Sequence, residues 1–163
     1  MNKNSKSNLK IVDLNYDCLE KLYSYLDFDN QIRLSMCHRR LEDVFIDLIC
    51  NRQPINCDFQ NLVHLSHTEK CQYFKTMAGY IRSIKMEVNR GKVLGLRDMS
   101  ICCKYRKYLR ELRKIELLNC TSYLIFFQFF GNWKGEHLVE LELCGCQLND
   151  LELRTVENLN ALQ

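Results

Sequence analysis

Three side chains near the middle of the chain are of types that bind metal ions. His64, His67 and Cys71 lie close together in the sequence. Structural zinc sites take four ligands, usually from clustered C-x-x-C or H-x-x-x-H pairs. The sequence holds no C-x-x-C pair, and Cys144 and Cys146 are separated by a single residue. The spacing therefore indicates no metal site, and we expect surface histidines and buried thiols instead.

The same residue types could supply a thiol nucleophile and a base. A reactive thiolate needs a positioned base and electropositive surroundings. With ten cysteines and four histidines, some pair will lie close by chance. No G-x-S-x-G elbow, Walker loop or dinucleotide fingerprint occurs in the sequence. We therefore expect a non-catalytic protein that uses no cofactor.

A basic stretch, Lys104 to Lys114, is the third feature that could do chemistry. Two tyrosines, Tyr105 and Tyr108, are interleaved with its cations, and only Glu111 opposes them. Such a stretch could contact nucleic acid or an acidic or phosphorylated partner. A solvated, convex helix gives the same pattern, and we favour it; nucleic-acid binding stays an alternative.

The composition is that of a folded protein. The chain has 163 residues, of which 47% are hydrophobic and 26% charged, and its net charge of +3 is too small to indicate nucleic acid or a membrane surface. The polar start, Met1 to Asn8, has no apolar region after it, and no run reaches the roughly 20 apolar residues of a membrane span. We expect no membrane association, reduced and mostly buried thiols, and a cytoplasmic or nuclear location.

Helical periodicity begins after a lead-in, residues 1–12, that we expect to be disordered. Leu19, Leu22 and Leu26 follow the i, i+3, i+7 spacing of one helix face, and Asn15 can cap that helix. Asp29 or Asn30 can cap the next helix. A clean amphipathic pattern then runs through Cys37, Leu41, Val44, Phe45 and Leu48. Residues 15 to about 50 therefore predict two or three short helices.

A loop and a connector helix are expected next, over residues 51–80. Residues 51–61 contain the only proline, Pro54, and predict a loop. Ser66 and Glu69 have the spacing of a capping box, and Gly79 can supply a left-handed stop. The helix should span about 67–78.

From residue 81 onward the period changes to L-x-x-L-x-L, which occurs three times and is typical of leucine-rich repeats. The framework residues are Ile81, Ile84, Met86, Leu112, Ile115, Leu117, Cys120, Leu138, Leu141, Leu143, Cys146 and Leu148. Such repeats turn alternate side chains of a short strand inward and cover the other side with a helix, and neighbours must stack to bury them.

Helices are accordingly expected at about 98–109, 121–130 and 149–158. Asp98 and Asp150 could be their N-caps, and Gly131 a stop. Leu159 and Leu162 resemble a fourth repeat cut short, so we expect the array at 81–163 to be incomplete at its C-terminus.

Residues 14 to 41 resemble the F-box. The matching residues, without a gap, are Leu14, Asp17, Leu19, Leu22, Ser24-Tyr25-Leu26-Asp27, Ile32, Leu34, Cys37 and Arg39-Arg40-Leu41. Asn15 stands in place of the usual proline, Asp17 in place of glutamate, and Gln31 where leucine is common. From the last departure we expect Gln31→Leu to strengthen a partner interface.

The resemblance implies an adaptor of cullin–RING ubiquitin ligases. Its F-box, residues 13–50, would dock the Skp-type linker subunit, which joins it to a cullin, and its repeats would hold an unknown protein substrate. The linker-binding residues implied are Leu14, Asn15, Leu19, Leu22, Leu26, Ile32, Leu34 and Cys37. The expected fold class is α/β: a short-helix F-box, then the first repeats of a leucine-rich solenoid with short parallel strands and outer helices. A leucine-rich interaction module outside any ligase is the competing hypothesis.

Overall fold

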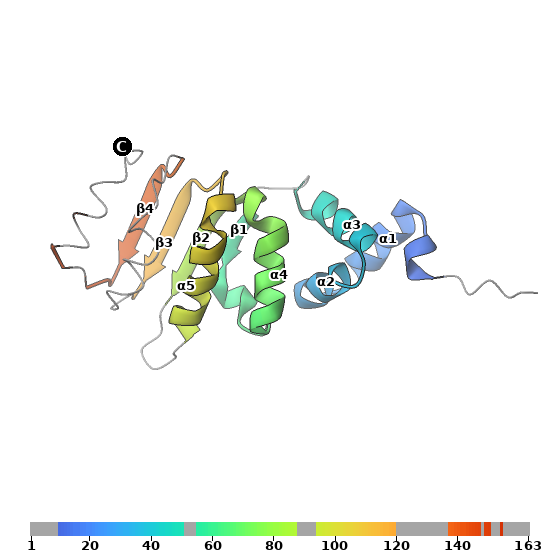
Figure 1. Cartoon of the computed structure of the whole chain (residues 1–163), viewed down its shortest axis with the longest axis horizontal. Helices are drawn as coiled ribbons and strands as arrows, with labels where there is room; N and C mark the ends of the chain where they lie inside the picture. Colours follow the sequence, from blue (N-terminus) through green and yellow to red (C-terminus); the bar gives the residue numbers. More distant parts are fainter. Residues whose placement is uncertain are drawn as a thin grey trace, which may run out of the picture. The chain divides into compact units, whose positions relative to one another are not determined.

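The chain forms a mixed α/β structure with five helices and one four-stranded parallel sheet among the residues described here (Figure 1). This computed structural model describes residues 10–50, 55–87, 94–119, 137–147, 149–150 and 154. The chain divides into two compact units, Met1–Asn51 and Arg52–Gln163. The α/β class expected from the sequence is confirmed. No helix in the described ranges is long and apolar enough to cross a membrane.

The first unit consists of three helices. They are α1 (Tyr16–Ser24), α2 (Phe28–Ser35) and α3 (Arg39–Cys50), preceded by a 3-10 turn, Ile11–Asp13. The disordered lead-in was predicted to extend to residue 12, which was too far, because Ile11 and Val12 already belong to this turn. The side chain of Asn15 accepts a hydrogen bond from the amide of Cys18, which confirms the predicted cap of α1. The cap of α2 is Asp27, so the predictions of Asp29 and Asn30 were wrong.

Tyr23 lies at the centre of this unit. Its ring is buried together with Leu19, Ile32 and Phe45, and its hydroxyl donates a 2.8 Å hydrogen bond to the carbonyl of Leu41 on α3. Burial raises the pKa of the Tyr23 phenol, because ionisation there would leave a charge with little solvation. The hydrogen bond satisfies the buried hydroxyl of Tyr23 and ties α1 to α3.

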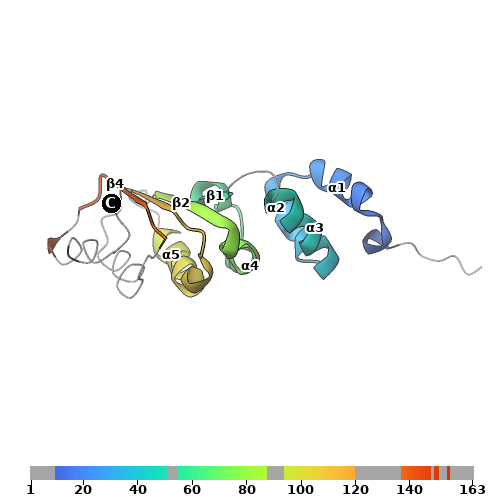
Figure 2. The same ribbon diagram turned by 90° about the horizontal axis from the view of Figure 1, so that it is seen from above.

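The second unit is built on parallel strands joined by helices. Its strands are β1 (Ile55–Asp58), β2 (Ile81–Glu87), β3 (Lys114–Leu118) and β4 (Glu140–Cys144), in the spatial order β1-β2-β3-β4. Helix α4 (His67–Met77) connects β1 to β2, and α5 (Leu94–Tyr105) lies between β2 and β3 in the chain. Both helices lie against the same face of the sheet (Figure 2).

Alternation along the strands explains which face is covered. Ile84 and Met86 of β2 are buried, as are Ile115 and Leu117 of β3, while the residues between them are partly exposed. The period of two therefore sends apolar side chains toward the helices and polar ones to the open face. In β4 the matching residues, Leu141 and Leu143, are only half-buried.

The expected loop at 51–61 was wrong in its second half. Residues Ile55–Asp58 form β1, and a 3-10 turn, Phe59–Leu62, follows. Ile55 and Cys57 are buried, and the strand pairs in parallel with β2. Four residues are too few to show a period, so the pairing with β2 decides their conformation. The sheet consequently begins one strand earlier than the repeats assigned from the sequence.

Helix ends also differ from expectation. The capping box of Ser66 and Glu69 is confirmed, but α4 ends at Met77 and Gly79 lies in a 3-10 turn without a positive φ. Helix α5 begins at Leu94, so Asp98 lies inside it rather than at its cap, and a 3-10 turn, Arg106–Tyr108, replaces the last predicted turn. The helix predicted at 121–130, its stop Gly131, and most of the one at 149–158 lie outside the described residues, as do Cys120, Leu148, Leu159 and Leu162.

The turn after β4 requires a glycine. Gly145 has a φ of +65°, and a Cβ built there would lie 2.6 Å from the Asn119 side-chain oxygen. We predict that Gly145→Ala destabilises the fold by about 1–2 kcal/mol, the cost of a left-handed backbone for an L-residue. Thermal unfolding measures this, with Gly79→Ala as the control, because a Cβ at Gly79 meets nothing closer than 3.9 Å. Equal melting temperatures for the two variants would contradict the prediction.

Candidate functional site

Within the residues that the structure describes, two surfaces are open, one on each unit. On the first unit, the residues predicted to bind a linker subunit divide by burial. Leu19 and Ile32 are fully internal, and Asn15 and Cys37 are exposed. The half-buried members are Leu14, Leu22, Leu26 and Leu34.

Three large apolar side chains of this unit, which the sequence did not single out as linker-binding residues, are exposed as well. Tyr25 is 74% exposed, and Phe28 and Met36 are also exposed. Leu22 lies in the last turn of α1, Tyr25 and Leu26 in the turn that follows, and Phe28 at the start of α2. Several large apolar side chains near one helix junction are typical of an interaction surface. We call Leu22, Tyr25, Leu26 and Phe28 the junction surface.

The half-buried side chain of Gln31, on α2, forms hydrogen bonds with the backbone between α1 and α2. Its side-chain amide nitrogen donates two 3.0 Å hydrogen bonds, to the carbonyls of Tyr23 and Leu26. The carbonyl of Tyr23 belongs to the last turn of α1 and also accepts from the amide of Leu26, whose own carbonyl lies in the turn after the helix. The Gln31 amide therefore ties α2 to the end of α1 and to the turn that follows it. Gln31 thus makes polar contacts within the chain, which leucine would lose; the effect of Gln31→Leu on a partner interface stays a prediction.

Arg40 also has a structural role that the sequence did not indicate. Its guanidinium donates to the carbonyls of Val12 (2.8 Å) and Leu14 (2.7 Å), residues before α1. The second residue of the basic pair thus fixes the start of the chain against α3. Because it is more than 25 residues away in sequence from those carbonyls, no local pattern could have predicted this contact.

We predict that Gln31→Leu lowers the free energy of unfolding by about 1–2 kcal/mol, because two hydrogen bonds to backbone carbonyls are lost. Chemical denaturation of the whole chain measures the change. The control is Gln60→Leu, which replaces an exposed glutamine whose side chain makes no hydrogen bond within the described ranges. An unchanged or higher stability of Gln31→Leu relative to that control would count against this structural role of Gln31.

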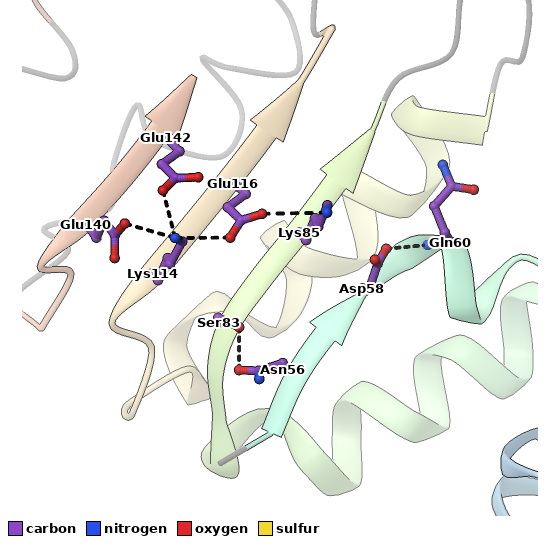
Figure 3. A network of polar contacts seen from close by, with 9 residues as sticks. All are labelled: Asn56, Asp58, Gln60, Ser83, Lys85, Lys114, Glu116, Glu140 and Glu142. Carbon is purple, nitrogen blue, oxygen red and sulfur yellow. Dashed lines mark hydrogen bonds and ion pairs between the residues drawn. The ribbon is translucent and has the colours of Figure 1, made fainter. Parts of the chain in front are cut away.

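The second open surface is the uncovered face of the sheet, where polar side chains stand in cross-strand rows (Figure 3). The register places Asn56, Ser83, Lys114 and Glu140 in one row, and Asp58, Lys85, Glu116 and Glu142 in the next. We call these eight residues the polar face. Neighbouring rows of this kind let charges on different strands meet, although they are about 30 residues apart in sequence.

Lys114 is the centre of the polar face. Its ammonium lies 2.8 Å from a carboxylate oxygen of Glu142, 2.9 Å from one of Glu140 and 3.1 Å from one of Glu116 (Figure 3). These hydrogen bonds raise the pKa of Lys114 and lower that of Glu142. Glu116 also approaches Lys85, at 3.9 Å. One cation thus holds three carboxylates from two strands.

A hollow of about 480 Å³ opens beside this network, over β1, β2 and β3. Its lining includes Arg113, which belongs to the basic stretch, and Arg82, which the sequence reasoning did not single out. The repeat pattern could have indicated both arginines. Each one directly follows the first framework residue of its repeat, Ile81 or Leu112, and its side chain is exposed. The lining is polar and carries both signs of charge, which suits a charged ligand rather than an apolar one.

The basic stretch does not form one convex helix, so that expectation was wrong. Lys104 lies at the end of α5, the 3-10 turn follows, and Lys114 lies on the open face of β3. Lys104 and Lys107 lie over the rings of Tyr105 and Tyr108, at 5.2 and 4.8 Å from the ring centroids. The stretch therefore divides between two surfaces, because the chain turns back into the sheet at its centre.

The thiols and histidines form no larger cluster in the described ranges, where no group of three or more His, Cys, Asp or Glu side chains could hold a metal ion. His67 and Cys71 do approach one another, at 3.6 Å on α4, and Cys146 donates to the carbonyl of Leu117. The described cysteines are free thiols, and only Cys57 and Cys102 are buried. The expectation of mostly buried thiols was therefore wrong for this part of the chain.

Comparison with protein-family models, with curated proteins and with solved structures found no match to this chain.

Removal of the Lys114 ammonium should change the pKa of Glu142. Pairing with Lys114 lowers the pKa of the Glu142 carboxyl. The pairing therefore stabilises the folded state at pH values above the ordinary pKa of glutamate, and this contribution is lost as the pH falls through the lowered pKa. We predict that Lys114→Met raises the pKa of Glu142 and destabilises the fold at neutral pH, but less so in acid, where the carboxylates are protonated.

Carboxyl-carbon NMR titration measures the first effect, and thermal unfolding at several pH values the second. Lys75→Met is the control, because Lys75 is an exposed lysine of α4, away from the polar face. A Glu142 titration that is the same in both variants would contradict the assigned pairing.

Proposed function

We propose that this chain is a non-catalytic substrate adaptor of a Skp–cullin–F-box ubiquitin ligase. In this proposal the first unit is an F-box that docks the Skp-type linker, and the sheet unit is the start of a leucine-rich solenoid that binds the protein to be ubiquitylated. The observation that carries the proposal is the register of the sheet. Framework residues from successive repeats align in rows, Ile84 with Ile115 and Leu141, and Met86 with Leu117 and Leu143.

Such alignment is what stacked repeats require. One repeat cannot bury its own apolar face, so a neighbour must offer the same residues at the same height. The side chains of Leu112 and Leu138, the first framework residues of consecutive repeats, are fully buried, and Asn119 donates its amide to the carbonyl of Cys144 at the corner after the strands. These contacts support a repeat array rather than an isolated sheet.

The first unit supports the other half of the proposal. Its own core takes Leu19, Tyr23, Ile32 and Phe45, and leaves the junction surface partly open. An adaptor needs such a surplus, because the linker must cover apolar side chains that the small unit cannot bury by itself. Function would then come from two binding surfaces and no bond-making residue.

A second candidate is a leucine-rich interaction module that joins no ligase, with the first unit only accompanying the repeats. One observation favours it: the side chain of Gln31 is engaged with the α1 carbonyls and is not free to contact a linker. Direct binding to the purified linker separates the two candidates.

We predict that Leu22→Asp or Leu26→Asp abolishes co-purification with a Skp-type linker subunit, because each places a charge in an apolar contact, at a cost of several kcal/mol. Both leucines are half-buried, so the variants retain the internal core around Leu19. Ser24→Asp is the matched control, since Ser24 is exposed and faces away from Leu22 on the same helix.

Circular dichroism of each variant shows whether α1–α3 remain folded. Capture of the linker by the wild type and by Ser24→Asp, but not by folded Leu22→Asp, is the expected result. No capture by the wild type would reject the ligase adaptor and favour the second candidate.

A further inference from the structure

Two arginines repeat at the same place in successive strands of the sheet unit. Arg82 directly precedes Ser83 of the polar face, and Arg113 directly precedes Lys114, the partner of Ser83 in the register. The amide of Arg113 donates a 2.8 Å hydrogen bond to the carbonyl of Arg82, so the two residues are neighbours across β2 and β3. Both side chains are exposed and both line the hollow.

These two guanidinium groups differ from the other cations of the hollow. Lys85 and Lys114 are paired with Glu116, whereas the guanidinium groups of Arg82 and Arg113 have no hydrogen-bond or ion-pair partner in the described part of the chain. Like charges on neighbouring strands repel one another. An anionic ligand between them would remove this repulsion and use donors that the fold leaves unused.

The two carboxylates that line the hollow, Asp58 and Glu116, form no ion pair with either arginine in the described part of the chain. Asp58 accepts from the amide of Gln60 at 2.9 Å, and Glu116 is shared by Lys85 and Lys114 (Figure 3). The hydroxyl of Ser83 donates to Asn56 at 2.6 Å. The lining carries four cations, Arg82, Lys85, Arg113 and Lys114, against these two carboxylates, which is a net charge of +2. The planar guanidinium fork of an arginine fits the oxygens of a phosphate in a bidentate manner.

The surroundings limit what kind of anion can bind. On the side of β4 the row ends in Glu140 and Glu142, whose charges would repel a polyanion that continued across the sheet. The residue at the height of the arginines on that side is Val139, which is 53% exposed and whose amide donates to the carbonyl of Arg113. A single dianionic group with an apolar neighbour fits this arrangement, and a nucleic-acid strand does not.

We propose that the hollow binds a phosphorylated side chain of a protein partner, with the phosphate between Arg82 and Arg113 and an apolar residue next to it over Val139. The inference rests on the proposed function only in taking the open sheet face as the substrate surface. It assigns the substrate class: a segment that this chain binds after phosphorylation and releases when the phosphate is removed.

The test is fluorescence-anisotropy titration of the full chain, at fixed ionic strength, with a labelled peptide pool. Each peptide carries one central phosphoserine with valine or leucine beside it and otherwise random uncharged residues. The same pool without phosphate is the second probe, and a single-stranded oligonucleotide of equal length is the third. We expect the phosphorylated pool to bind at least about tenfold more tightly than either of the others, in line with a bidentate charge-assisted contact.

Variants then locate the site. Arg82→Gln with Arg113→Gln should remove the preference for phosphate, and Val139→Ser should weaken binding of the phosphorylated pool while keeping the preference. The matched control is Lys75→Gln with Arg110→Gln, which removes two exposed cations that do not line the hollow. Because all four charges are exposed, each variant should fold, and circular dichroism checks this.

The outcomes distinguish this proposal from the ligase proposal. A folded wild type that captures the linker but binds both peptide pools equally overturns the phosphate site alone. Stronger binding of the oligonucleotide overturns it in favour of nucleic acid, and an equal loss in the control variant reduces it to general ionic attraction. Phosphate preference that depends on Arg82 and Arg113 supports it, even if linker capture fails.

Discussion

The sheet unit depends on one constraint: parallel strands in register must hide one face and leave the other in water. Successive side chains of a strand point to opposite faces of the sheet. The register that aligns Ile84, Ile115 and Leu141 on the apolar face therefore also aligns Ser83, Lys114 and Glu140 on the polar face. Helices α4 and α5 cover the apolar face (Figure 2). Burial of the apolar rows therefore sets the positions of the polar residues on the opposite face.

The open face is stabilised by its own charges. Lys114 holds carboxylates on β3 and β4 together, which offsets the repulsion that three neighbouring glutamates would otherwise exert. Arg82 and Arg113 take no part in this network in the described part of the chain, which is why we propose them as the anion-binding cations.

In the first unit, polar contacts fix the backbone while apolar side chains remain outside. Tyr23 joins α1 to α3, Gln31 closes the end of α1, and Arg40 holds the residues before it. A unit of this size has a small apolar core. These hydrogen bonds add to the stability of its fold, while several leucines stay only half-buried. In the described residues, the side chains of the junction surface stay partly exposed.

Local signals in the sequence determined the helix starts at Asn15 and at Ser66 with Glu69, because a cap is satisfied within three or four residues. They also determined the strands from residue 81 onward, where a repeated period reveals the buried face. Tertiary structure decided the strand at Ile55–Asp58, which is too short to show a period and is defined by pairing with β2. It also decided the roles of Gln31 and Lys114, since both depend on groups brought near by folding: carbonyls at the end of another helix, and carboxylates on the next strand.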